Sequence, residues 1–182
     1  MTVSVNLRKH FAWLLFTAVF AFGAAPAIAA GPKGDNLVDV AVAVNSEGPY
    51  AGQFDTLIAA VLAADPAVVQ TLTGNGQHTV FAPTDTAFGM LGITEENLDD
   101  LLANGTLTVE ALTDILLYHV AHGRRDSGDV LASEKIRMLN RGFVQQAGGV
   151  LTDNQGNMSN IIVTDVPAAN GIIHAINGVL LP

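Results

Sequence analysis

The chain has 182 residues, contains no cysteine, and carries 17 acidic against 8 basic side chains, which gives a formal net charge of −9 at pH 7. Without cysteine, disulfides, thiol catalysis, thiolate metal sites and iron–sulfur clusters are excluded. The negative charge disfavours nucleic acids and anionic membrane surfaces as partners, because like charges repel.

The first 29 residues have the pattern of a secretory signal peptide. A basic pair at 8–9 precedes an apolar run over 11–22, and Ala27 and Ala29 follow as an Ala-x-Ala cleavage site. The run is shorter than the roughly 20 residues that span a bilayer, so an uncleaved membrane anchor is the weaker alternative. We therefore expect a secreted protein, extracellular or periplasmic, that does not insert into a membrane after cleavage.

Cleavage after Ala29 would leave 153 residues (182 − 29), which is enough for one domain with a sizeable core. Residues 30–36 form a polar spacer, and residues 37–182 are expected to form that domain. Within 37–182 the sequence contains no linker, low-complexity tract or internal repeat.

The first half of the domain predicts helices. Apolar residues over 54–62 recur at the i, i+3, i+4, i+7, i+8 spacing of an amphipathic helix. Pro66 suits the first position of a second helix, Thr94 the N-cap of a third, and Thr108 the N-cap of a fourth. The fourth helix has an apolar face made of Val109, Leu112, Ile115, Leu116 and His119.

A strand running into a short helix is expected between the second and third helices. Phe81 belongs to an apolar strand, and Pro83 ends that strand by restricting the residue before it to an extended conformation. Thr84 is placed to cap the following helix, and Phe88 returns to the core.

The second half predicts strands. Gly- and Asn-rich turns at 140–142, 148–149 and 154–157 separate β-rich runs, which include 161–163 and 172–176. In the last run, Ile173 and Ala175 alternate with Ile172, His174 and Ile176. Helices followed by strands indicate an α+β fold rather than regular βαβ units.

Three segments resemble the fasciclin domain family, in the order and spacing of that family. They are TVFAPTDTAF over 79–88, ILLYHVAHG over 115–123 and NGIIHAINGVLLP over 170–182, and the resemblance covers about residues 36–182. The resemblance implies a wedge of two β-sheets with several helices packed beside it, mainly from the N-terminal half. It also implies a module for adhesion to cell-surface or matrix proteins or polysaccharides, with self-association as another form of contact, and without enzymatic activity or cofactor.

The resemblance also indicates candidate partner-binding residues. Asp114-Ile115 resembles the short Asp-Ile motifs that fasciclin-domain matrix proteins are thought to offer to integrins, and Tyr118-His119 has been proposed for the same role. The alternative is that Ile115 and His119 are core residues on the apolar helix face. His174, between two isoleucines, is likewise expected to be a hydrogen-bonded core residue.

Apart from Lys33, every basic residue of the mature chain lies between 124 and 141. Arg124 and Arg125 therefore join the candidate binding residues as the start of a positively charged patch on an acidic body. The alternative is a solvated strand edge that Lys and Arg protect from unwanted pairing.

A secreted metal-dependent or hydrolytic enzyme is the alternative function. It would use His119 and His122, which are three residues apart, with Asp126 or Asp129 nearby. The sequence contains no Gly-x-Ser-x-Gly motif and no other pairing of a nucleophile with a base. We therefore assign no catalytic, metal-binding or cofactor-binding residue.

Overall fold

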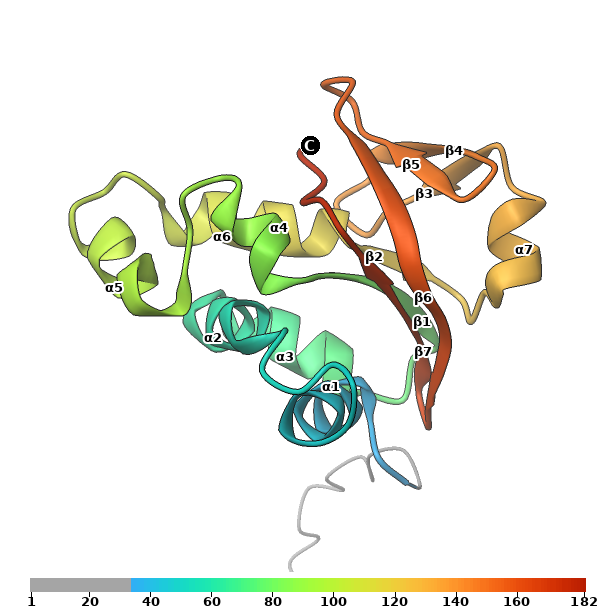
Figure 1. Ribbon diagram of the computed structural model, residues 1–182, viewed down its shortest axis with the longest axis horizontal. Coiled ribbons are helices and arrows are strands. Elements are labelled where there is room, and N and C mark those ends of the chain that lie inside the picture. Colours follow the sequence, from blue (N-terminus) through green and yellow to red (C-terminus); the bar gives the residue numbers. More distant parts are fainter. Residues whose placement is uncertain (1–33) are drawn as a thin grey trace, which may run out of the picture.

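The computed structural model describes residues 34–182, so the proposed signal peptide and most of the spacer lie outside the described residues. The helices are α1 (Leu37–Ser46), α2 (Asp55–Ala63), α3 (Pro66–Thr73), α4 (Asp85–Gly89), α5 (Glu95–Ala103), α6 (Val109–Tyr118) and α7 (Ser127–Leu131). The strands are β1 (His78–Pro83), β2 (Val120–His122), β3 (Lys135–Arg137), β4 (Phe143–Ala147), β5 (Val150–Thr152), β6 (Met158–Ala168) and β7 (Gly171–Ile176). The expected α+β class is confirmed, with six of the seven helices before every strand except β1 (Figure 1).

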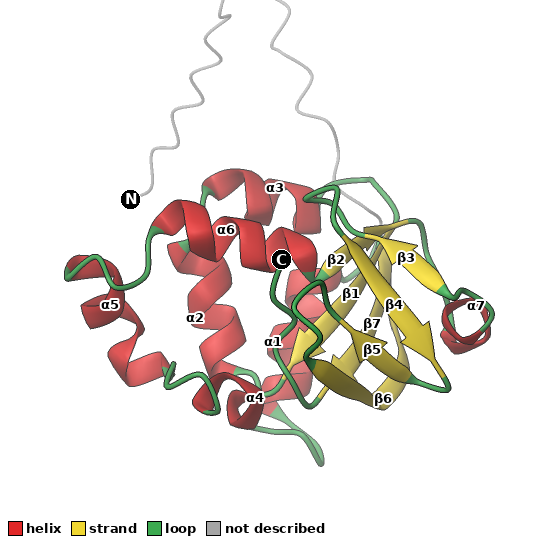
Figure 2. Ribbon diagram, turned by 90° about the horizontal axis from the view of Figure 1, so that it is seen from above, coloured by secondary structure: helices red, strands yellow, loops and turns green. Residues whose placement is uncertain are grey.

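The strands are hydrogen-bonded in the order β2-β1-β7-β6-β5-β4-β3. β1 and β7 are parallel, whereas the other neighbours are antiparallel. The long strand β6 pairs with β5 through its first residues and with β7 through the rest, so it joins the two halves of one seven-stranded sheet. Figure 2 shows helices α1 to α6 beside one side of the central strands, and β3 to β5 with α7 on the other.

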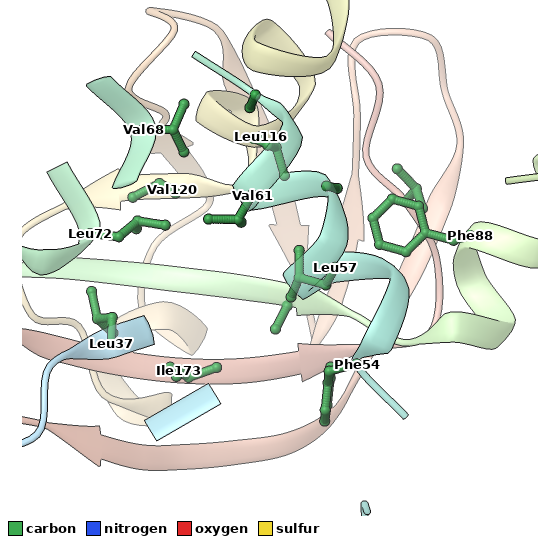
Figure 3. Packing of buried hydrophobic residues seen from close by; sticks show 14 of the residues in the cluster. Leu37, Phe54, Leu57, Val61, Val68, Leu72, Phe88, Leu116, Val120 and Ile173 are labelled. Carbon is green, nitrogen blue, oxygen red and sulfur yellow. The ribbon is translucent and has the colours of Figure 1, made fainter. Parts of the chain in front are cut away.

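Two apolar cores lie on opposite faces of the central strands. The first core, between those strands and the helices, includes Phe88 and Leu116 together with Ile173 and Ala175 of β7 (Figure 3). The second core contains Ile176 of β7 and is made of Phe81, Tyr118, Ala121, Val130, Ile136, Met138, Val144, Leu151, Ile176 and Leu180. The alternation predicted for the last strand is therefore correct, and it divides β7 between the two cores.

The predicted helix starts are confirmed at Pro66, which begins α3, and at Thr108, whose side chain accepts from the Ala111 N–H at 3.2 Å. Two residues predicted on buried helix faces are exposed instead: Leu62 by 70% and Val109 by 42%. Leu62 is the last residue but one of α2 and Val109 is the first residue of α6, and helical spacing alone does not show how far along a helix the apolar face is covered. β2 and α7 were not predicted.

The predicted cap at Thr84 differs from the structure. Thr84 occupies the N-cap position of α4, but its side chain makes no cap hydrogen bond. The neighbouring Asp85 carboxylate instead accepts from the backbone N–H groups of Asp55 and Thr56, at 3.3 and 2.9 Å. Asp85 thus caps helix α2, whose own N-cap residue, Phe54, has no acceptor side chain. Phe88 is buried, as predicted.

Both ends of helix α1 are held by asparagine side chains. At the start, the fully buried Asn170 accepts from the Leu37 N–H at 2.9 Å and donates to carbonyl oxygens of Leu72 and Gly74 at 2.7 and 2.9 Å. At the end, Asn45 donates to the Asp55 carboxylate at 2.6 Å and accepts from the Phe54 N–H at 2.8 Å. These bonds fix the position of α1 without depending on close apolar packing.

Candidate functional site

Tyr118, the last residue of α6, lies entirely within the second core. Its hydroxyl donates to the Phe143 carbonyl oxygen at 2.6 Å and accepts from the Asn154 N–H at 3.2 Å. Burial raises the pKa of the Tyr118 hydroxyl, which favours the protonated donor. The side chain therefore connects α6 to β4 and to the turn between β5 and β6, and it has no exposed surface for a partner.

His119 follows Tyr118 and is also buried, with 3% of its surface exposed. Its Nδ1 lies 2.8 Å from the Ile115 carbonyl oxygen, and its Nε2 lies 2.9 Å from the Leu180 backbone nitrogen. Because a carbonyl accepts and an N–H donates, Nδ1 carries the proton and Nε2 accepts. Burial lowers the pKa of His119 to about 4, so the ring is neutral at pH 7.

Asp153 is a buried carboxylate that sequence reasoning missed. It binds the backbone of Leu181, the residue after the one that His119 holds. Asp153 accepts from the Leu181 N–H at 2.8 Å, from the Gln155 N–H at 2.9 Å, and from the backbone and side chain of Asn157 at 2.8 and 2.9 Å. Burial acts to raise the pKa of Asp153, but these donors outweigh it and hold the pKa below its usual range. His119 and Asp153 together secure two consecutive N–H groups of the last apolar run.

Asp114 and Ile115 differ in what they expose. The Asp114 side chain is exposed and accepts from the Asn140 side-chain amide at 3.1 Å. Ile115 is half-buried and packs against the first core. Of the four candidate residues over 114–119, Asp114 is the one that is exposed.

Arg124 and Arg125 connect the segment after β2 to neighbouring elements. Arg124 donates through one guanidinium nitrogen to the carbonyl oxygens of Ala168 and Gly171, at 3.0 and 2.9 Å. Arg125 is half-buried and donates to the Ser133 hydroxyl at 3.3 Å. Part of each guanidinium is thus engaged in holding loops together.

The residues of the alternative enzymatic site are not brought together. His119 uses both ring nitrogens within the fold, whereas the ring of His122 lies beside His78, with 5.8 Å between their centroids. Asp126 caps α7 by accepting from the Asp129 N–H at 2.9 Å. Over residues 34–182, no group of three or more His, Cys, Asp or Glu side chains is arranged to hold a metal ion.

A positively charged face lies on the β3–β4 hairpin. Lys135 and Arg137 are exposed, and their charged groups lie over the Phe143 ring, at 4.3 and 5.9 Å from its centroid. Phe143 is 38% exposed, and it pairs with Arg137 across the hairpin. We call Lys135, Arg137 and Phe143 the basic face. The alternation of Lys, Ile and Arg in β3 is the sequence signal for it, because residues two apart share a face of a strand.

An apolar cavity of about 310 Å³ lies between helices α1 to α3 and the sheet strands β1, β6 and β7. The part of the first core drawn in Figure 3 contributes Leu37, Leu57, Val61 and Ile173 to its walls. Sequence reasoning gave no sign of this cavity.

The family model for the fasciclin domain matches residues 52–182. Protein sll1483 from Synechocystis sp. is 39% identical over 132 residues, which cover 71% of this chain and 67% of that protein. Transforming growth factor-beta-induced protein ig-h3 from Sus scrofa is 34% identical over 132 residues, which cover 71% of this chain but 18% of that protein. The similarity to ig-h3 therefore concerns a small part of that longer protein.

A solved structure with the same fold is the FAS1 domain pair from the insect cell adhesion molecule Fasciclin I. It superposes with a TM-score of 0.50 and 21% sequence identity, over 66% of this chain and 42% of that chain. At this identity the likeness concerns the fold alone.

Among residues 34–182, no single helix is both long and apolar enough to cross a membrane, although α2 and α3 together reach that length and composition with a bend of 116° between them.

Proposed function

Because this chain belongs to the fasciclin domain family, we propose that it is a secreted, non-enzymatic binding module that attaches to an acidic surface or matrix partner. The adhesive role is inferred from membership in the fasciclin domain family. Secretion follows from the signal-peptide pattern of residues 1–29. The contact surface is the basic face.

The observation that carries the proposal is the charge distribution. Residues 34–182 contain five basic and seventeen acidic side chains. Arg124 and Arg125 are partly engaged with loops, whereas Lys135 and Arg137 stand exposed on one strand beside Phe143. An acidic partner is repelled by most of the surface and attracted here, which orients the encounter. The exposed Phe143 ring adds an apolar contact at the centre of the same face.

The non-enzymatic part of the proposal is supported by the positions of the histidines. A metal ion or substrate could reach His119 only by displacing its bonds to Ile115 and Leu180. Metal analysis after native purification tests this part: we expect no bound transition metal, and stoichiometric zinc or iron would favour the enzymatic alternative.

The contact surface is tested by a pull-down with the tagged protein against the envelope fraction of the producing organism. Lys135→Gln with Arg137→Gln removes two charges from the basic face and should weaken capture strongly. Gln70→Glu with Ala43→Glu changes net charge by the same amount at exposed positions on α3 and α1, and should leave capture nearly unchanged. Added salt should weaken the wild-type contact, because exposed charges are screened.

Three results would argue against this surface. Equal capture of both double variants would mean that Lys135 and Arg137 only protect a strand edge from pairing. Capture that is insensitive to salt would exclude an electrostatic contact. If neither double variant loses capture but Asp114→Asn does, the contact surface is on helix α6.

A further inference from the structure

We propose that the cavity beneath α1 binds an uncharged ligand that is mostly hydrocarbon. Three observations support this: the composition of the walls, the incomplete packing of the helices that form them, and the placement of the few polar groups. The cavity lies on the helix side of the sheet, away from the basic face, so the inference is independent of the proposed function.

The walls of the cavity are almost entirely apolar. Twenty-two of its 25 lining residues are Ala, Val, Leu, Ile, Phe or Pro, and the other three are Glu47, Tyr50 and His119. Protein interiors are normally close-packed, with few voids larger than a water molecule. Water in such a space would find few hydrogen-bonding partners, so the surroundings favour a hydrocarbon. The volume of about 310 Å³ is within the range of small-molecule sites.

Helix α1 is too apolar for the packing it makes. Its sequence is LVDVAVAVNS, yet Leu37 is its one fully buried residue, and Val38, Val40, Ala41 and Val44 are only partly buried against the first core. Two further lining residues are exposed, Val42 of α1 by 42% and Leu62 of α2 by 70%. Valines lower helix propensity slightly, and their apolar surface gives stability only when it is covered. A bound hydrocarbon would cover these side chains.

The cavity is prevented from collapsing by the polar bonds at both ends of α1, made by Asn170 and Asn45. The sheet wall is also irregular. β6 has register shifts between Ile161 and Val163 and between Val163 and Val166, and both valines line the cavity. Bulges of this kind often occur next to binding sites, where they alter the direction of side chains.

The polar groups of the lining indicate that the ligand is uncharged. His119 is neutral, and both of its nitrogens are already hydrogen-bonded. Glu47 and Pro49 lie in the loop between α1 and α2, and both are exposed, so this loop forms the mouth. The Glu47 carboxylate would repel a fatty-acid carboxylate there, as would the acidic body of the protein. The phenol of Tyr50 at the same mouth suits a neutral hydroxyl head group.

Binding can be measured with the neutral fluorophore N-phenyl-1-naphthylamine, using protein purified after expression of the full sequence. We expect the fluorophore to bind saturably, and 1-decanol to displace it at a concentration at least about fivefold lower than decanoate requires. The two competitors have the same chain length, so the difference reports their charge. Glu47→Gln should reduce this preference by improving decanoate, whereas Glu96→Gln, on the distant helix α5, should leave it unchanged.

A matched pair of variants on α1 locates the site. Ala41 lines the cavity, whereas Ala43 is exposed and does not. Ala41→Phe should fill the space and weaken probe binding by about tenfold or more, whereas Ala43→Phe should leave it within about twofold. If Ala41→Phe lowers the melting temperature sharply, Val42→Trp provides the same test. Val42 also lines the cavity but is partly exposed, so a larger side chain there disturbs the core less. Equal binding by the cavity and control variants, or the absence of displacement by 1-decanol, would overturn the proposal.

Discussion

Replacing His119 with glutamine is expected to change how the stability of this protein depends on pH. The buried ring donates to Ile115 and accepts from Leu180, so its neutral form is the one that fits the fold. Glutamine also offers one donor and one acceptor group but does not titrate. At neutral pH the substitution should cost about 1–3 kcal/mol, because a flexible amide side chain does not reproduce both bonds of a rigid ring.

The magnitude follows from the pKa of His119, which burial lowers from 6.5 to about 4. Below pH 6.5 the His119 ring takes up a proton in the unfolded chain but not in the folded protein. The unfolded state therefore binds more protons, and the free energy of unfolding decreases as the pH decreases. The contribution is complete above pH 6.5 and is lost progressively as the pH falls to 4. The loss amounts to about 3 kcal/mol over that window.

Urea unfolding followed by circular dichroism at several pH values between about 7 and 4 measures this loss. The wild-type protein should lose about 3 kcal/mol more than His119→Gln over that range. The pKa of His78 is also lowered by burial, but this residue is present in both proteins, so its contribution cancels. The lowered pKa of Asp153 acts below about pH 4, outside the window. Parallel pH profiles for the two proteins would refute the argument that His119 is held neutral by burial.

The remaining predictions concern the core, a buried asparagine and the N-terminus. Phe81→Ala and Phe88→Ala should each lower the free energy of unfolding by about 3–5 kcal/mol, with the exposed Phe143→Ala as control; melting temperatures equal to that of the control would exclude a core role. Asn170→Ala leaves three backbone groups without their partner and should cost more than about 3 kcal/mol in urea unfolding, whereas a loss below about 1 kcal/mol would mean that water replaces the amide. The intact mass of the exported protein should correspond to a chain beginning near Ala30, and full-length protein retained in the membrane would contradict the signal-peptide prediction.

Much of the local structure was predictable because its causes are local. Pro83 ends β1 and Pro66 begins α3, since proline restricts its own backbone and that of the residue before it. The turns of the second half were visible in Gly and Asn, and β7 alternates between two cores as its sequence indicated. The same segments carried the family resemblance, which the family model matches over 52–182.

The candidate site was predicted less completely, because exposure is decided by partners far along the chain. Tyr118 and His119 were identified from a motif, but apart from the bond between His119 and Ile115 their bonds run to residues 25 to 61 positions away. For the neighbouring residues, sequence spacing could not show that the side chain of Asp114 is exposed whereas that of Ile115 is half-buried. Asp85 lies in the first turn of its own helix, and its carboxylate also caps helix α2, which begins 30 residues earlier.

The sequence by itself determined the class of fold, the order of its helices and strands apart from β2 and α7, and the excess of acid over base outside 124–141, because these depend on composition and on short-range backbone restrictions. The tertiary structure alone decided the rest. It pairs β1 with β7 in parallel, places Lys135 and Arg137 over Phe143, and leaves an apolar cavity beneath α1. Each of these depends on the distance between segments that are far apart in the chain, and no local preference of a residue specifies that distance.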